Sequence, residues 1–314
     1  MRVAPVLIWT RTTCARCWQY DGRMRPADLP IPLIADLSAG LIANPWRAHL
    51  ALEYEYRGGR TVLASRRHDG PLVVQKALYP EGEAVCHNIV VHPPAGIVGG
   101  DYLDIHARVG THGHTLLTTP GAGKWYRSAG PWAHQQLTFT LDEAACLEWL
   151  PQETIVFDGA MANIETNVLL AKGARYLGWD VMCLGRAGSG ERFQRGHIRN
   201  RVTILRDGKP LWIERGGIEA GGLLALAAAG LGGKTVCGTM LAVAENLESI
   251  DLGACRDLVA EAGETSITRL PGLMVVRYLG ESSEAARRYF VAVWEHLRPV
   301  VAARAAVAPR IWNT

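Results

Sequence analysis

Hydrophobic and polar residues alternate with a period of two along much of the chain from Trp46 onward. The alternation is clearest over residues 49–57, 102–109, 133–141 and 198–204, where every second position is mostly apolar. Gly58-Gly59, Gly110–Gly113 and Asp207-Gly208 follow three of these runs and are typical of turns between strands. We therefore predict a mainly β fold, a large single body of many short strands.

Two stretches near the C-terminus have helical spacing instead. The first is Asp251–Ala262, and the second is Ser283–Leu297, in which apolar residues recur at steps of three and four. Ser282 or Ser283 can cap the second helix at its start, and Pro299 is expected to end it. Its aromatic face either packs in the core, which is the commoner case, or binds a partner protein in a groove.

Residues 1–45 differ in character from the rest of the chain. They contain five prolines and no sustained period, so we predict an N-terminal extension at 1–45 and a β-rich domain at 46–314. Cys14 and Cys17 in the extension have the spacing of a zinc or redox pair. A structural zinc site needs a second pair of ligands, and the sequence holds no partner motif for it.

The composition favours a globular protein with a sizeable core, because 48% of its residues are hydrophobic and 20% are charged. The net charge of +3 gives no reason to expect nucleic acid or an anionic membrane as a partner. The most apolar run, residues 221–233, is too short and too rich in glycine to span a membrane. Seven widely spaced cysteines, an odd number, indicate a reducing compartment, and we predict a cytoplasmic protein.

The sequence Gly121-Ala-Gly123-Lys124 looks at first like part of a phosphate-binding loop. That loop needs a glycine five positions before Gly123 and a hydroxyl residue after the lysine, but Thr118 and Trp125 stand there. Pro120 also removes a backbone amide that would contact the phosphate. We therefore predict a bend in which small residues let two segments approach closely.

Several residues offer ligands or acid–base groups. Five of the ten histidines lie between His87 and His114, close to Asp101 and Asp104, and nitrogen and carboxylate ligands suit nickel or zinc. Without a clean metal motif, surface and turn positions remain the simpler interpretation. Glu153 and Asp158 punctuate an apolar stretch, where they would serve acid–base chemistry, a polar path for a cation, or, for Asp158, an Asp-Gly turn.

Three longer motifs resemble the urease accessory protein family called UreD or UreH. They are residues 92–101 (HPPAGIVGGD), 118–128 (TTPGAGKWYRS) and 149–153 (WLPQE), and residues 294–299 and 309–312 are similar to the usual ending of that family. The resemblance covers roughly Trp46 to the C-terminus. Its characteristic positions here are Gly99, Gly100, Pro120, Gly121, Gly123, Lys124, Arg127 and Ser128.

The resemblance implies a scaffold without catalytic activity that helps nickel enter apo-urease. It implies UreF, the GTPase UreG and apo-urease as partners, a dimeric state within that complex, and no firmly bound cofactor beyond transient Ni²⁺. It also implies a polar path for the ion, and we expect His92, Asp101, Glu153 and Asp158 to contribute to it. The alternative is a metal-dependent β-rich hydrolase that uses Glu153 and Asp158.

Overall fold

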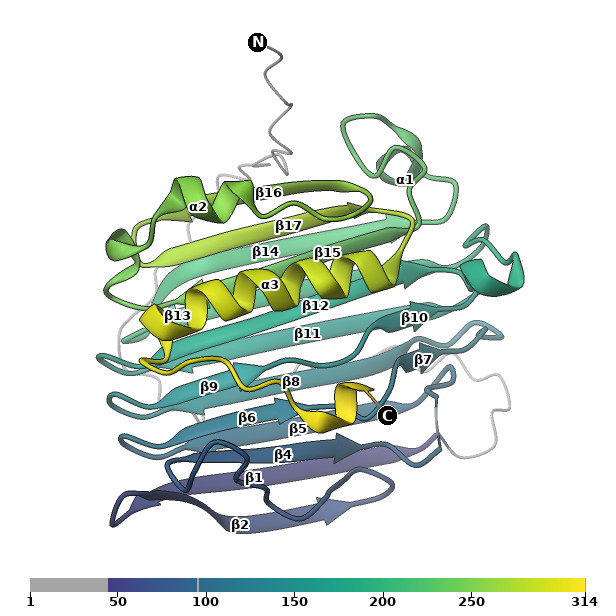
Figure 1. The fold of residues 1–314 in the computed structure, drawn as a ribbon. Helices are drawn as coiled ribbons and strands as arrows, with labels where there is room; N and C mark the ends of the chain where they lie inside the picture. Colours follow the sequence, from purple (N-terminus) through teal and green to yellow (C-terminus); the bar gives the residue numbers. More distant parts are fainter. Residues whose placement is uncertain (1–44, 95, 314) are drawn as a thin grey trace. The chain divides into compact units, whose positions relative to one another are not determined.

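Two β-sheets are packed face to face, and one long helix covers the outer face of the larger sheet (Figure 1). The structure is a computed structural model that describes residues 45–94 and 96–313. Apart from Pro45, the extension predicted at residues 1–45 lies outside the described residues, and so does the Cys14/Cys17 pair. The prediction of a mainly β single body is confirmed.

The smaller sheet has seven strands and contains all of the clearest alternating runs of the sequence. Leu50, Leu103 and Leu137 point inward and are buried, whereas Glu53 and Asp104 point outward, as period two requires. Across the sheet, the strands are β14 (Lys209–Glu219), β13 (His197–Arg206), β11 (Met161–Leu170), β8 (Ala133–Leu141), β5 (Tyr102–Val109), β1 (Arg47–Arg57) and β2 (Arg60–Asp69).

The larger sheet has ten strands and is covered on both faces, so its strands are more continuously apolar. Its main path is β16 (Glu264–Leu270), β17 (Leu273–Gly280), β15 (Val236–Val243), β12 (Arg175–Leu184), β9 (Cys146–Trp149), β6 (His114–Thr118), β4 (Val85–Val91) and β3 (Val73–Val74). Two short strands complete it, because β10 (Thr154–Val156) pairs with both β12 and β7 (Gly123–Trp125).

The middle of the chain winds between the two sheets. β5, β8, β11 and β13 lie side by side and parallel in the small sheet, while β6, β9 and β12 do so in the large one. Parallel neighbours need a long crossover connection, and here the strand in the opposite sheet serves as that crossover. The turn at Gly110–Gly113 therefore joins the two sheets, whereas Gly58-Gly59 and Asp207-Gly208 close antiparallel hairpins.

Helix α3 (Ser283–Val301) begins where the sequence predicted, because the Ser282 side chain accepts a hydrogen bond from the Ala285 N–H at 3.1 Å. The prediction that Pro299 ends the helix is wrong, since the helix continues to Val301. A proline in the last turn costs one backbone hydrogen bond, but Val301 is fully buried and the Ala302 N–H bonds to the Arg298 carbonyl.

The other helices are short. α2 (Leu252–Asp257) occupies only the first half of its predicted range, and α1 (Leu223–Leu226) lies in the glycine-rich apolar run, where no helix was predicted. Single 3₁₀ turns are η2 (Ala187–Ser189), η3 (Leu247–Ser249) and η4 (Arg310–Asn313). Within the described ranges, no helix is long and apolar enough to cross a bilayer.

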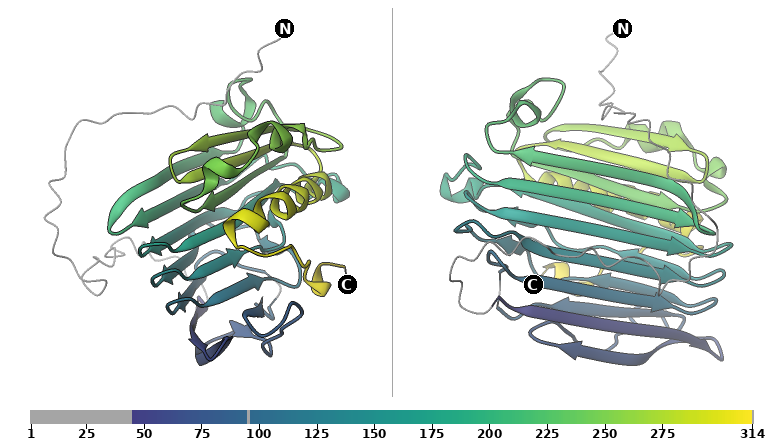
Figure 2. Two further views of the ribbon diagram at one scale, coloured as in Figure 1. Left: turned by 60° about the vertical axis from the view of Figure 1, so that its left-hand side comes forward. Right: turned by 180° about the vertical axis from the view of Figure 1, so that it is seen from behind.

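Apolar side chains form two cores, one on each face of the ten-stranded sheet. The first core fills the space between the sheets, and the second lies between the larger sheet and α3. The layers that enclose them are drawn as ribbons in Figure 2. The aromatic face of α3 belongs to the second core, where Phe290, Val293 and Trp294 are fully buried. This confirms the core interpretation of that face and removes it as a docking surface.

Candidate functional site

A cavity of about 390 Å³ lies between the two sheets. Its walls come from inward positions of β5, β8, β11, β13 and β14 on one side and of β9, β12 and β15 on the other. Most of the wall is apolar, but the winding of the chain also brings several polar side chains to it, namely His92, Gln135, Gln152, Asp180, Asn200 and Glu214. They place a few polar groups in a mostly apolar wall.

Asp180 is the most unusual of these lining residues. Burial raises the pKa of its carboxyl to about 6, and the nearby negative charge of Glu214 adds to the effect. Within the described residues it makes no hydrogen bond or ion pair. Asp180 is therefore a carboxyl group at the cavity wall that has no partner in the described part of the chain, and its raised pKa lets it exchange a proton near pH 6.

The other charges at this end of the cavity are paired. Asp180, Thr239 and Arg277 are opposite one another in register across β12, β15 and β17, so their side chains share the inward face. Arg277 Nη1 donates to Thr239 Oγ1 and, from the opposite sheet, to Glu214 Oε1 at 2.7 Å. Because Arg277 is already shared by these two groups, it leaves the Asp180 carboxyl uncompensated.

His92 and Asp101 lie close enough for the charge of Asp101 to act on His92. His92 lines the cavity, and its buried Nε2 atom has no hydrogen-bond partner among the residues that the structure describes. Burial lowers the pKa of His92, although the charge of Asp101 acts in the opposite direction. The Asp101 carboxylate accepts hydrogen bonds from the N–H groups of Trp46 and Val98 at 3.0 and 2.9 Å, so it also anchors the start of β1.

Glu153 and Asp158 flank β10. Glu153 stands between two residues that line the cavity, Gln152 and Thr154. Asp158 accepts from the backbone N–H of Gln194 and of Arg195 at 2.8 Å, and from the Arg195 guanidinium. Asp158 thus stands in a turn closed by the Ala160 N–H and the Phe157 carbonyl, and its side chain ties that turn to residues 194–195.

The structure does not bring the four predicted nickel-path residues into one cluster. Among the described residues, the group of ligand-type side chains whose ligand atoms all lie within 4.8 Å of one another is His49, Asp104 and His106. Of the four predicted path residues, His92 alone is among the residues that line the cavity.

The glycine-rich motif forms a bend followed by a strand. Lys124 lies in β7, and the Ile97 N–H bonds to its carbonyl at 2.8 Å, so the first and second family motifs pair with each other. A side chain at Gly99 would collide with Ser128, and one at Gly96 with the Tyr126 ring. The predicted bend is confirmed at residues 120–121, and Lys124 is not at a helix N-terminus. The predicted close approach is not found at Gly121 or Gly123, where an added Cβ atom would have no neighbour within 4 Å; it occurs instead at Gly96 and Gly99 of the first motif.

The structure explains which residue stands at two further family positions, Gly100 and Arg127. Gly100 has a φ of 97°, which favours glycine, and its N–H bonds to the Trp132 carbonyl at 3.0 Å. The Arg127 side chain packs against Gly159, where a Cβ atom would lie 2.9 Å from it. These contacts hold the loops at one end of the two sheets in place.

Sequence reasoning missed a buried charge network beneath α3. The Glu148 carboxylate is fully buried in β9. It accepts hydrogen bonds from the Arg298 guanidinium and from Trp294 Nε1, the latter at 2.7 Å, and it pairs with His114 Nε2 at 2.8 Å. Glu81 binds the other side of the Arg298 guanidinium at 2.7 Å. A lone glutamate in the apolar run 145–150 was the available signal, because such a residue needs a buried partner.

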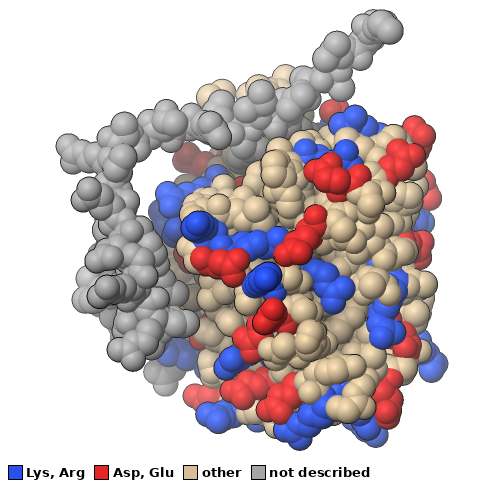
Figure 3. All heavy atoms as spheres, turned by 90° about the vertical axis from the view of Figure 1, so that its left-hand side faces the viewer, with Lys and Arg blue, Asp and Glu red and all other residues tan. Residues whose placement is uncertain are grey.

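The described surface carries both signs of charge. On the face shown in Figure 3, acidic and basic side chains are intermixed, without a large patch of one sign. Cys86, Cys146, Cys183, Cys237 and Cys255 are free thiols.

Comparison with known proteins identifies the family. The family model described as "UreD urease accessory protein" matches residues 47–313, which include every strand and helix described above. The chain belongs to the UreD family. The resemblance inferred from the three sequence motifs is therefore confirmed, and all three lie inside the UreD match.

Individual UreD proteins are similar over most of their length. The chain is 54% identical over 273 residues to the urease accessory protein UreD of Dechloromonas aromatica, covering 86% of this chain and 95% of the relative. It is 52% identical over 282 residues to UreD of an Azoarcus species, covering 90% and 99%. UreD of Nitrosococcus oceani is 47% identical over 274 residues, covering 87% and 92%.

Proposed function

We propose that this chain is a non-catalytic scaffold in urease maturation that helps nickel to enter apo-urease. Membership of the UreD family supports the role in urease maturation. The proposed partners are UreF, the GTPase UreG and apo-urease, with the chain present in a dimeric complex in the cytoplasm. No firmly bound cofactor is required, since Ni²⁺ is the cargo.

The observation that carries the proposed mechanism is the set of polar side chains in the mostly apolar wall of the cavity between the sheets. Nickel is a borderline cation that binds imidazole and carboxylate, and the lining offers His92, Asp180 and Glu214. Glu214 is already paired with Arg277. Because the described groups do not form a closed set of ligands, they would hold the ion weakly and release it. Lys124 also lines the cavity, and its positive charge weakens cation binding nearby.

The four residues predicted from the sequence take different places in this proposal. His92 lines the cavity, and Asp101 lies close enough to influence its charge. Glu153 neighbours two lining residues on β10. Asp158 is engaged by Arg195, so its contribution to the path requires that ion pair to open. Asp180 is the residue that we add to the set.

The alternative of a metal-dependent hydrolase receives less support. It needs Glu153 and Asp158 to hold a metal or a water molecule together, but Asp158 is engaged by Arg195. Turnover of a substrate by the purified chain alone would favour the hydrolase and overturn the scaffold proposal.

The test is urease activation in cells that express the urease subunits and all accessory proteins. Asp180→Asn, and His92, Asp101, Glu153 and Asp158 each replaced by alanine, should lower the nickel content of purified urease while the accessory complex still assembles. Asp257→Asn, at an exposed position in α2, is the matched control and should load nickel normally. Normal nickel content in all five variants would overturn the proposed path.

A further inference from the structure

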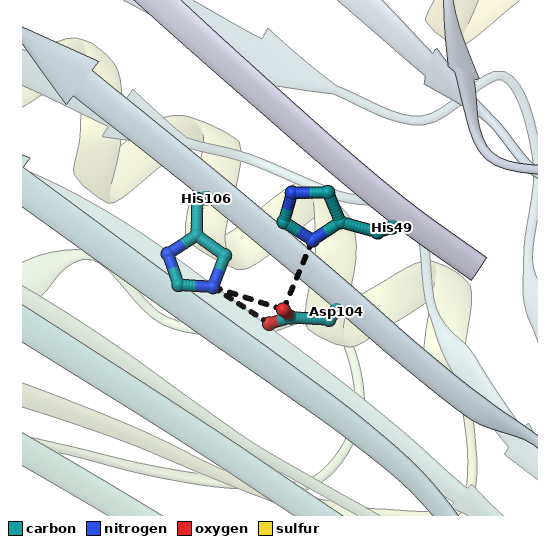
Figure 4. Close-up of side chains that lie close together, drawn as sticks. All are labelled: His49, Asp104 and His106. Carbon is teal, nitrogen blue, oxygen red and sulfur yellow. Dashed lines mark hydrogen bonds and ion pairs between the residues drawn. The ribbon is translucent and has the colours of Figure 1, made fainter. Parts of the chain in front are cut away.

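Three side chains with metal-ligand chemistry lie together on the outer face of the seven-stranded sheet (Figure 4). His49 in β1 is directly opposite Asp104 in the parallel strand β5, and His106 follows Asp104 by two residues on the same face. Their neighbours in sequence, Leu50 and Ile105, point to the other face and are buried between the sheets. The cluster is therefore separated from the cavity by the sheet itself.

The distances in this cluster match those between neighbouring ligands of a metal ion. His49 Nδ1 lies 3.0 Å from Asp104 Oδ2, and His106 Nε2 lies 2.9 Å from Asp104 Oδ1. Ligand atoms that are about 2.1 Å from an ion, at right angles to one another, are about 3 Å apart. Small rotations of the two imidazole rings would bring all three groups around one ion.

The Asp104 carboxylate is strongly disposed to accept a cation. Its Oδ1 atom is buried and accepts no hydrogen bond from any described residue, even though His106 Nε2 lies 2.9 Å away. A carboxylate oxygen in this state gains a partner when an ion binds.

The two imidazoles are accessible from solvent. The side chains of His49 and His106 are 46% and 43% exposed, against 22% for Asp104. Opposite His106 in β1 stands Ala51, whose short side chain lets the two rings approach each other; their centroids are 5.5 Å apart. An ion can therefore enter from water and keep water at its remaining positions.

Charges from neighbouring strands act in both directions. Asp69 in β2 is directly opposite His49 and adds a negative charge to this face, whereas Arg67 is opposite Ala51 and opposes a cation. On the other side of β5, the neutral Gln136 of β8 is opposite Asp104. The charges of Asp69 and Arg67 offset each other near the cluster, so the neighbouring strands neither strengthen nor prevent cation binding, as reversible binding requires.

We propose that His49, Asp104 and His106 form a surface site for a borderline divalent transition-metal ion, bound by two imidazoles and one carboxylate. Three protein ligands with open positions differ from the closed four-ligand arrangement of a structural zinc site, so the ion is exchangeable. The site goes beyond the proposed function, because it needs neither urease nor the inter-sheet path. It would place an ion on the outside of the scaffold.

The test is an isothermal calorimetric titration of the complete chain with Ni²⁺ alone. His49→Ala, His106→Ala and Asp104→Asn should each weaken one Ni²⁺ equivalent at least tenfold. His296→Ala is the matched control, since His296 is exposed on α3, and it should leave the titration unchanged. Circular dichroism of each variant establishes that the fold is retained, and Asp104→Asn, which keeps the side-chain shape, provides the answer if an alanine variant fails to fold.

A second comparison separates this site from the path between the sheets. Asp180→Asn should leave the equivalent that depends on His49 in place, even if it removes other Ni²⁺ binding. If the chain binds no Ni²⁺, or if the three variants bind it as the unchanged chain does, the site does not exist. Either result leaves the proposed function open to its own test of urease loading.

Discussion

The guanidinium group of Arg298, in α3, is bound by the carboxylate of Glu148, in β9, across 150 residues of sequence. Arg298 Nε lies 3.0 Å from both carboxylate oxygens, and neither side chain is exposed to solvent. Glu81 binds the other edge of the guanidinium, and a bond to the Ala305 carbonyl completes it. This pair attaches α3 to the ten-stranded sheet in one orientation.

Breaking the pair should strongly destabilise the fold. Glu148→Gln or Arg298→Met removes one charge and leaves its partner buried, which typically costs about 3–5 kcal/mol in the free energy of unfolding. The double variant should be less destabilised than the sum of the two single changes, because it leaves no unpaired charge between these residues. Urea denaturation of the four proteins measures this coupling, and additive losses would show that the pair contributes nothing specific.

The same network predicts how stability depends on pH. Burial acts to lower the pKa of His114, but its buried neighbours Cys146 and Glu148 raise it from 6.5 to about 9. A group with a raised pKa stabilises the fold fully below its unfolded pKa, and this stabilisation is lost as the pH rises through its folded pKa. The free energy of unfolding should therefore fall between pH 6.5 and 9, and His114→Gln should flatten this part of the profile.

At acidic pH, the free energy of unfolding should change in the opposite direction and rise with pH. Burial acts to raise the pKa of Glu148, but His114 and Arg298 lower it from 4.5 to about 2. Its contribution is present above pH 4.5 and is lost as the pH falls towards 2. Thermal unfolding between pH 2 and 9 should show the largest contribution of the network between pH 4.5 and 6.5, and a profile unchanged by His114→Gln would contradict this account.

The glycines of the family motifs should not be equivalent. At Gly99, an added Cβ atom would collide with Ser128 and lie 2.8 Å from the Pro131 carbonyl, whereas at Gly123 it would have no neighbour within 4 Å. We expect Gly99→Ala to cost about 1–3 kcal/mol, as overpacked sites do, and Gly123→Ala to be close to neutral. Melting temperatures of the two variants test this, and equal losses would refute the steric explanation.

Asp158 allows a test that separates structure from ion transport. Its carboxylate binds the exposed Arg195 side chain and two backbone N–H groups. Arg195→Gln removes mainly a surface ion pair and should lower the free energy of unfolding by no more than about 1 kcal/mol. Asp158→Ala also removes the acceptor of the two backbone N–H groups and should lower it by more. If Asp158 serves the nickel path, Asp158→Ala should lower urease nickel content and Arg195→Gln should not. Equal nickel content in both variants would assign Asp158 to the turn alone.

The local pattern predicted local structure well. Period-two alternation identified β1, β5, β8 and β13, because each of these strands has one buried face and one exposed face. Ser282 predicted the start of α3, because its side chain accepts a hydrogen bond from the Ala285 N–H and caps the helix. Pro299 misled the prediction of the helix end, since tertiary burial of Val301 outweighs a lost backbone hydrogen bond.

The winding between two sheets was not visible in that pattern. Alternation shows that a strand has a buried face, but not which sheet it joins. The turn at Gly110–Gly113 has the composition of a hairpin and nevertheless carries the chain across to the other sheet. Strand pairing depends on contacts between residues that are distant in sequence, and period two contains no information about them.

The sequence by itself determined the strand-rich class, the turn positions and, through three motifs, the UreD family. These are decided by backbone preferences and side-chain periodicity within a few residues. Only the tertiary structure decided that Asp180 has no partner among residues 45–94 and 96–313, that Glu148 meets Arg298, and that His49 faces Asp104 and His106. Those relationships arise where separate strands and helices meet, and burial then sets the charge and the chemistry of each group.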